Sequence, residues 1–163
     1  MRQAIMVSPG KIEFREVPVP KFGADEILLK VRRIGVCGSD IHVWHGKHPY
    51  TKYPVVQGHE FSGIVEAVGK NVTGVKAGIK CTARPQLVCG KCAPCRRGDY
   101  NICDVLRVQG FQAPGCAQDF FVTSKDRIVP IPDSMGIEDG ALVEPTAVAA
   151  HSTARAGGLE GRN

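Results

Sequence analysis

Residues 89–103 read CGKCAPCRRGDYNIC, and glycine or proline stands at the turns Gly90, Pro94 and Gly98. The stretch holds four cysteines at a spacing typical of metal ligands: Cys89, Cys92, Cys95 and Cys103. Two-residue gaps let a tight loop bring sulfurs to one point, and the longer return supplies the fourth. Because four thiolates complete the tetrahedral coordination of Zn²⁺, the stretch predicts a structural zinc site without an open position.

Disulfides and an iron–sulfur cluster are the alternatives for these cysteines. The chain has seven cysteines, an odd number, and we expect no secretory segment, which together fit reduced thiols better than disulfides. An iron–sulfur cluster uses other spacings and commonly has a proline after its last cysteine, whereas Asp104 follows Cys103. Zinc is therefore the favoured occupant.

The bulk composition is that of an ordinary globular protein. The 163 residues are 43% hydrophobic and 23% charged, and no apolar run approaches the roughly 20 residues of a membrane span. The net charge is +5, but the adjacent arginines at 32–33 and 96–97 are only short pairs and form no basic stripe. We therefore expect a cytoplasmic protein without a nucleic-acid or membrane partner.

Short β-rich runs separated by glycine and proline predict a mainly β fold, a barrel or a sandwich. These runs are Ala4–Val7, Ile12–Val17, Glu26–Val36, Gly63–Val68, Phe120–Val122 and Ile128–Pro130. The third run has the pattern of a long core strand. Helix is expected only at Ser39–Trp44 and at Met135–Ala156, the latter starting at Asp133 or Ser134 and interrupted by Pro145.

A second set of possible metal ligands is spread along the chain. Residues 58–72 read GHEFSGIVEAVGKNV, residues 35–42 read GVCGSDIH, and residues 140–145 read GALVEP. Together with the four-cysteine loop, these motifs resemble the N-terminal, GroES-like catalytic half of the zinc-dependent medium-chain alcohol and polyol dehydrogenases. The third motif is similar to the sorbitol and butanediol dehydrogenase branch of that family.

The resemblance implies a GroES-like, partly closed β-barrel with short helices over residues 1–156, with a zinc-binding lobe at about 81–110. Residues 157–163 would then be a linker toward a Rossmann domain that this chain lacks. The resemblance also implies a catalytic zinc in addition to the structural one. Its expected ligands are Cys37, His59, Glu60 and Glu144, and which of the two glutamates binds directly stays open.

Two more residues match the proton relay of the family. The resemblance implies that the Ser39 hydroxyl contacts the substrate oxygen and that His42 passes the proton outward. The alternative for Ser39 is a helix cap, which is compatible with the first role. Elsewhere, His45 and His48 are expected in a solvated loop, Cys81 and Cys116 as small buried residues and His151 either in the core or beside a cofactor.

The expected function is that of a catalytic-domain fragment of a zinc-dependent, NAD(P)-linked dehydrogenase. The substrate would be a small secondary alcohol, polyol or vicinal diol, and the fragment alone is expected to be inactive. Threonine and sugar-phosphate dehydrogenases of the same family, a zinc-free quinone reductase and a non-enzymatic zinc-stabilised binding module are the alternatives. Apolar residues at 141–150 would lack their cover, so we expect self-association or displacement of residues 144–163.

Overall fold

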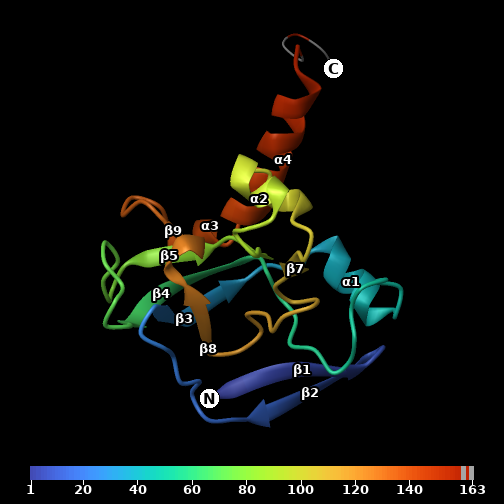
Figure 1. The fold of residues 1–163 in the computed structure, drawn as a ribbon. Coiled ribbons are helices and arrows are strands. Elements are labelled where there is room, and N and C mark those ends of the chain that lie inside the picture. The colour runs from blue at the N-terminus through green and yellow to red at the C-terminus, as the bar shows by residue number, and fades with distance from the viewer. Residues whose placement is uncertain (159–160, 162–163) are drawn as a thin grey trace.

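The computed structural model describes residues 1–158 and residue 161, and its centre is a five-stranded antiparallel sheet (Figure 1). From edge to edge the strands are β8 (Phe120–Ser124), β3 (Glu26–Ile34), β4 (Phe61–Val68), β5 (Lys80–Ala83) and β9 (Ile128–Pro130). The mainly β class predicted from the sequence is confirmed. The described strands form three sheets, none of which closes into a complete ring.

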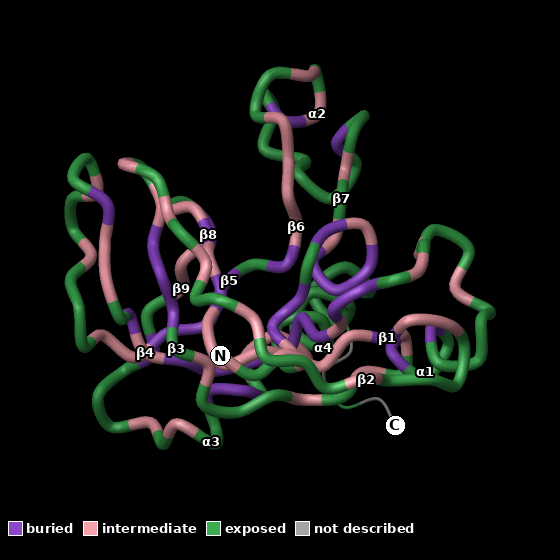
Figure 2. The backbone as a smooth tube through the Cα atoms, turned by 90° about the horizontal axis from the view of Figure 1, so that it is seen from below, coloured by how far each residue is buried: buried purple, intermediate pink, exposed green. Residues whose placement is uncertain are grey.

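Strand β3 is the core strand that its apolar sequence predicts. It pairs with β4 on one side and β8 on the other, and Ile27 and Leu29 are fully buried. Figure 2 shows this buried backbone running through β3 and β4. Gly63 allows the close approach of these strands, since a Cβ there would lie 2.7 Å from the Lys30 oxygen. Cys81 and Cys116 belong to the same apolar cluster, as expected.

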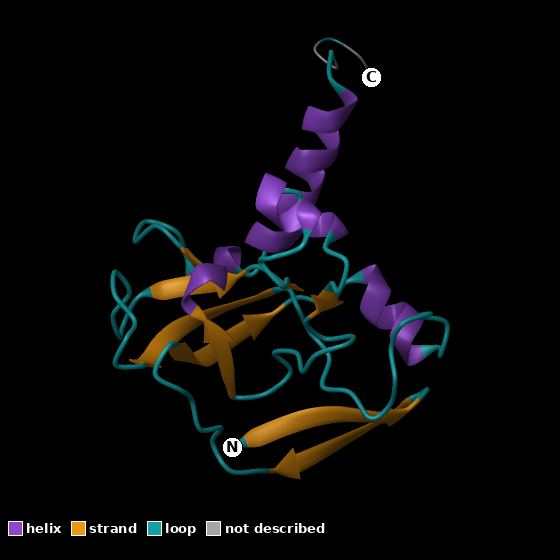
Figure 3. Cartoon of the chain, viewed as in Figure 1, coloured by secondary structure: helices purple, strands orange, loops and turns teal. Residues whose placement is uncertain are grey.

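A hairpin of β1 (Arg2–Ser8) and β2 (Lys11–Glu16) forms a separate sheet below the central one (Figure 3). Main-chain hydrogen bonds in both directions join Met6 to Val55, at 2.8 and 2.9 Å. A second apolar cluster lies behind this contact and consists of Met6, Val43, Val55 and Phe111. The hairpin therefore supports the chain segment that leads to His59.

The four-cysteine stretch forms a lobe that projects from the sheet, as Figure 2 shows. The lobe leaves and rejoins the body through the paired strands β6 (Gln86–Leu87) and β7 (Arg107–Val108). Between them lie α2 (Ala93–Arg97) and a 3₁₀ turn at Tyr100–Ile102. The short strands β5, β6 and β7 were not among the runs predicted from the sequence.

The helices lie outside the sheets. Helix α1 (Gly38–Trp44) lies where helix was expected. The single helix expected at Met135–Ala156 is wrong in detail, because α3 (Ile137–Gly140) and α4 (Val143–Ala156) are separate and Gly136, not Asp133 or Ser134, caps the first. Pro145 does not interrupt α4, since it sits in the first turn, where a missing N–H costs no hydrogen bond.

Helix α4 extends away from the sheet and none of its residues is buried (Figure 1). Most of the expected linker 157–163 follows it and lies outside the described residues, which include only Gly157, Gly158 and Gly161 of that segment. No helix among the described residues is long and apolar enough to cross a membrane.

Candidate metal centres

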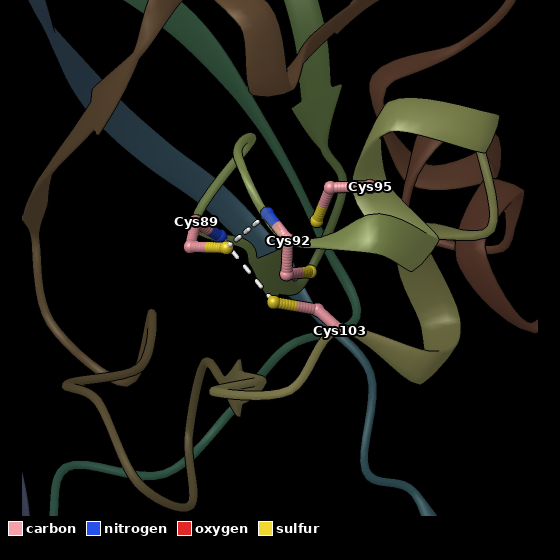
Figure 4. A group of neighbouring side chains, drawn as sticks. All are labelled: Cys89, Cys92, Cys95 and Cys103. Carbon is pink, nitrogen blue, oxygen red and sulfur yellow. Dashed lines mark hydrogen bonds between the residues drawn. The ribbon is translucent and has the colours of Figure 1, made fainter.

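The four cysteines of the lobe point toward one another (Figure 4). Their sulfur atoms all lie within 4.8 Å of one another. Sulfurs bound at about 2.3 Å to one tetrahedral zinc are roughly 3.8 Å apart, so the cluster is compatible with a single metal ion. All seven cysteines of the chain are free thiols in the structure.

The pKa values of two thiols in this cluster are shifted in opposite directions. Main-chain N–H groups of Lys91 and Cys92 lower the pKa of Cys89 to about 6. Burial, together with the sulfurs of Cys92 and Cys103, raises the pKa of Cys95 to about 12. Four thiolates at this distance thus need a cation to coexist, which fits a divalent metal.

Three side chains from distant segments form a second cluster. Cys37 precedes α1, while His59 and Glu60 precede β4, and their ligand atoms also lie within 4.8 Å of one another. Thiolate, imidazole and carboxylate are the usual protein ligands of zinc, and catalytic sites combine three of them with an open position. The donor set therefore fits a catalytic zinc.

The burial of His59 and Glu60 also fits a bound metal ion. His59 and Glu60 are only 6% and 8% exposed, and His59 Nδ1 is a buried atom without a hydrogen-bond partner. Among the described residues no ion pair neutralises Glu60. Buried charges and polar atoms are costly unless paired, and a bound cation would satisfy both groups.

Glycines allow the backbone to approach these ligands closely. A Cβ at Gly35 would lie 2.5 Å from Glu60 Oε2. The main-chain nitrogen of Gly35 donates a hydrogen bond to the main-chain oxygen of Glu60 at 2.8 Å. Gly58 has a φ of +95°, a conformation that favours glycine, and a Cβ there would lie 2.9 Å from the Cys116 sulfur. The motif glycines thus position Glu60 and His59 sterically.

Asp40 is a positioning residue that the sequence analysis missed. It is buried in the first turn of α1, and its Oδ2 accepts a hydrogen bond from the main-chain nitrogen of Cys37 at 3.0 Å. The signal in the sequence was an acidic residue three positions after a helix N-cap, where such carboxylates commonly bind the N-cap nitrogen.

The two expected relay residues are in different surroundings. Ser39 Oγ lies 3.5 Å from Cys37 Sγ, next to the second cluster, whereas His42 is exposed on α1. Ser39 is not the helix cap, because Cys37 occupies that position. The described hydrogen bonds include none between Ser39 and His42, so a proton path between them would need a bridging group.

Glu144 stands near the second cluster without joining it. It is half-buried in the first turn of α4, and its carboxylate is not among the three groups within 4.8 Å. Burial raises the pKa of Glu144, the charge of Glu60 adds to the rise, and the charge of His59 opposes it. Glu60 is thus better placed than Glu144 for direct metal binding.

The remaining histidines differ from one another. His45 is exposed, as expected for a solvated loop, but His48 is half-buried and stacks on Phe111 with ring centroids 4.5 Å apart. Phe111 also contacts the ring of His59, at 5.0 Å. Burial, with the nearby charge of His42, lowers the pKa of His48. His151 is exposed on α4, so its packing in the core is excluded.

With this geometry established, comparison with known proteins gives the family. The sequence profile of the alcohol dehydrogenase GroES-like domain matches residues 23–133. The chain belongs to this family. Its GroES-like fold confirms the expectation drawn from the motifs, and its relatives include proteins named as sorbitol dehydrogenase and D-xylulose reductase.

Individual relatives of this GroES-like domain agree with the assignment. Sorbitol dehydrogenase from Bacillus subtilis is 36% identical over 160 residues, covering 95% of the chain and 45% of that protein. Galactitol-1-phosphate dehydrogenase from Escherichia coli superimposes with a TM-score of 0.91 at 31% identity, covering 98% and 46% of the two chains. An alcohol dehydrogenase from Escherichia coli CFT073, in complex with NADH, gives a TM-score of 0.88 at 33% identity, covering 95% and 45%. The GroES-like chain thus spans a little less than half of these relatives.

Proposed function

We propose that this chain is the metal-carrying catalytic domain of a zinc- and NAD(P)-dependent dehydrogenase. Its substrate would be a secondary alcohol, polyol or vicinal diol. The observation that carries the proposal is the convergence of the half-buried Cys37 with the buried His59 and Glu60, with an unpartnered His59 nitrogen and no neutralising ion pair for Glu60 among the described residues. The names of the relatives, sorbitol dehydrogenase above all, support this class of substrate.

The residues of the chain have separate roles in this proposal. Cys37, His59 and Glu60 hold the metal, and a zinc ion bound there would supply Lewis-acid chemistry for oxidation of an alcohol. Ser39, beside Cys37, accepts the hydroxyl proton of the substrate while it gives its own proton to a bridging group, which passes a proton on to His42 at the surface. Cys89, Cys92, Cys95 and Cys103 bind the structural zinc of the lobe.

The domain organisation is part of the proposal. The relatives are about twice as long as this chain, and one of them carries NADH. We infer that residues 1–156 form the catalytic domain, that residues 157–163 lead toward a Rossmann domain, and that the nicotinamide cofactor binds mainly there. The isolated chain would then bind metal and be catalytically silent.

A sugar-phosphate dehydrogenase is the second candidate, since galactitol-1-phosphate dehydrogenase has a closely similar fold. The test is a dehydrogenase assay of the intact protein with NAD⁺ or NADP⁺ and a panel of polyols, vicinal diols and their phosphates. We expect turnover that His59→Ala abolishes and that Ser39→Ala lowers by roughly a hundredfold or more. Absence of turnover on every alcohol, with metal bound only at the four cysteines, would favour a binding module instead.

A further inference from the structure

Gln109 is a fully buried amide at the base of the cysteine lobe. It directly follows β7, and its main-chain nitrogen donates to the Pro85 oxygen at 3.0 Å, which joins the returning and outgoing strands of the lobe. Its side chain uses both ends of the amide. Oε1 accepts from Arg127 Nη2 at 2.5 Å, and Nε2 lies 3.4 Å from the Gly58 oxygen as a long hydrogen bond.

Arg127 connects the other side of the lobe base. It is 7% exposed, its Nε donates to the Arg84 oxygen at 2.8 Å, and its guanidinium lies over the ring of Phe121. Burial lowers the pKa of Arg127 to about 10, so the group is still charged at neutral pH. Among the described residues no carboxylate pairs with Arg127, and the Gln109 oxygen is therefore one of its few polar partners.

The backbone next to Gln109 packs against Gly58, the residue that precedes His59. A Cβ at Gly110 would lie 2.9 Å from the Gly58 nitrogen, so the two backbones are in direct contact. The Gly58 oxygen accepts a second hydrogen bond, from the Cys116 nitrogen at 3.0 Å. A shift of the loop after β7 would therefore displace the backbone that carries His59.

We propose that Gln109 is a positioning residue that transmits the order of the cysteine lobe to the His59 segment, so that metal in the lobe strengthens metal binding at Cys37, His59 and Glu60. The inference rests on the proposed function in one respect, namely that both clusters bind metal. The bridge runs from the lobe base through Gln109 to Gly58, and Arg127 holds Gln109 against Arg84.

The chemistry of the bridge explains why an amide is needed. Arg127 Nη2 donates a hydrogen bond here and the Gly58 oxygen accepts one, and glutamine supplies the matching acceptor and donor from one side chain. Gln109→Glu keeps the acceptor but places a carboxylate oxygen against the Gly58 oxygen. Gln109→Leu removes both hydrogen bonds at similar volume. The matched control is Thr123→Val, a buried polar group in β8 whose hydroxyl has no partner.

Titration of the metal-free protein with Co²⁺ separates the two sites, because a site with four thiolates and a site with one differ in their sulfur-to-cobalt charge-transfer absorption. We expect Gln109→Leu and Gln109→Glu to weaken the one-thiolate site by about tenfold or more, the range usual for residues that orient metal ligands. The four-thiolate site should be retained in Gln109→Glu, and Thr123→Val should leave both affinities unchanged. Unchanged affinity of the one-thiolate site in both Gln109 variants would overturn this inference but would leave the proposed function intact.

A double-mutant cycle tests the coupling itself. Cys92→Ser should weaken the one-thiolate site in the wild-type background and have little further effect in Gln109→Leu. Equal effects in the two backgrounds, or no effect in either, would contradict the bridge. If the wild-type protein binds no Co²⁺ at Cys37, His59 and Glu60, the proposed function fails and the inference fails with it, a result distinct from the others.

Discussion

The Gln57 amide lies 3.2 Å from both the main-chain oxygen and Oδ1 of Asp40. This contact joins the start of α1, which carries Cys37, to the segment that carries His59. The other carboxylate oxygen of Asp40 binds the Cys37 nitrogen at 3.0 Å. One buried carboxylate therefore holds two ligand-bearing segments together without itself belonging to the cluster.

Asp40→Ala should destabilise the protein, because it leaves the Cys37 nitrogen without its acceptor and leaves the Gln57 amide with only the Asp40 main-chain oxygen. The cost of such unsatisfied buried groups is about 1–3 kcal/mol in the free energy of unfolding. Urea unfolding measures it, and Asp25→Ala, which removes an exposed carboxylate bonded to Asn71, is the control. Equal stability of the two variants would show that Asp40 has no structural role.

Gly35→Ala should disturb the second metal cluster without unfolding the sheet. The new Cβ would lie 2.5 Å from Glu60 Oε2 and 3.0 Å from Glu60 Cβ, so the glutamate side chain must move. We expect about a tenfold loss of zinc affinity at that cluster. Gly38→Ala is the matched control, since a Cβ there meets nothing within 4 Å. The same zinc affinity in both variants would argue against close packing at Gly35.

Glu60 and Glu144 should differ as metal ligands. Glu60 belongs to the cluster of three donors, while Glu144 lies outside it. Glu60→Gln should therefore lower zinc affinity more than Glu144→Gln, as measured by competition with a chelator of known affinity. A larger effect of Glu144→Gln would reverse the assignment and make Glu144 the direct ligand.

The lobe should loosen independently of the core. Cys92→Ser removes one of four ligands, and metal-binding energy in such a site is local folding energy. Hydrogen exchange should rise in residues 89–103 and stay low in β3 and β4, because the lobe leaves and rejoins the body through the short strands β6 and β7. Cys81→Ser, in the buried core, should instead raise hydrogen exchange in β3 and β4 and leave it unchanged in residues 89–103. Loss of protection in β3 after Cys92→Ser would contradict this separation.

Local patterns made most of the fold predictable. The cysteine loop was readable because its ligands lie within fifteen residues, and β3 was readable because a strand paired on both sides is apolar along much of its length. The error at Met135–Ala156 arose from taking Pro145 as a break, although a proline is tolerated in the first turn of a helix. The two helices are in fact separated between Gly140 and Val143, where the sequence has no proline.

The second cluster could not be derived from spacing alone. Cys37 and His59 lie in different segments, and only the resemblance to the dehydrogenase family connected them. Gln57 and Gln109 were missed because their partners are set by tertiary contacts that no local pattern encodes, whereas the bond of Asp40 to the Cys37 nitrogen is a local capping contact that the sequence could have indicated. The same holds for His48, which lies in a loop as expected but is half-buried and stacks on Phe111 instead of being fully solvated.

The most direct test of the account is anomalous diffraction at the zinc edge from crystals of the zinc-saturated protein. We expect two anomalous peaks, one bonded to the four cysteine sulfurs and one at about 2.0–2.3 Å from Cys37 Sγ, a His59 ring nitrogen and a Glu60 oxygen. A single peak in the lobe, with the Cys37 and His59 side chains turned away from each other, would contradict the proposed catalytic metal centre.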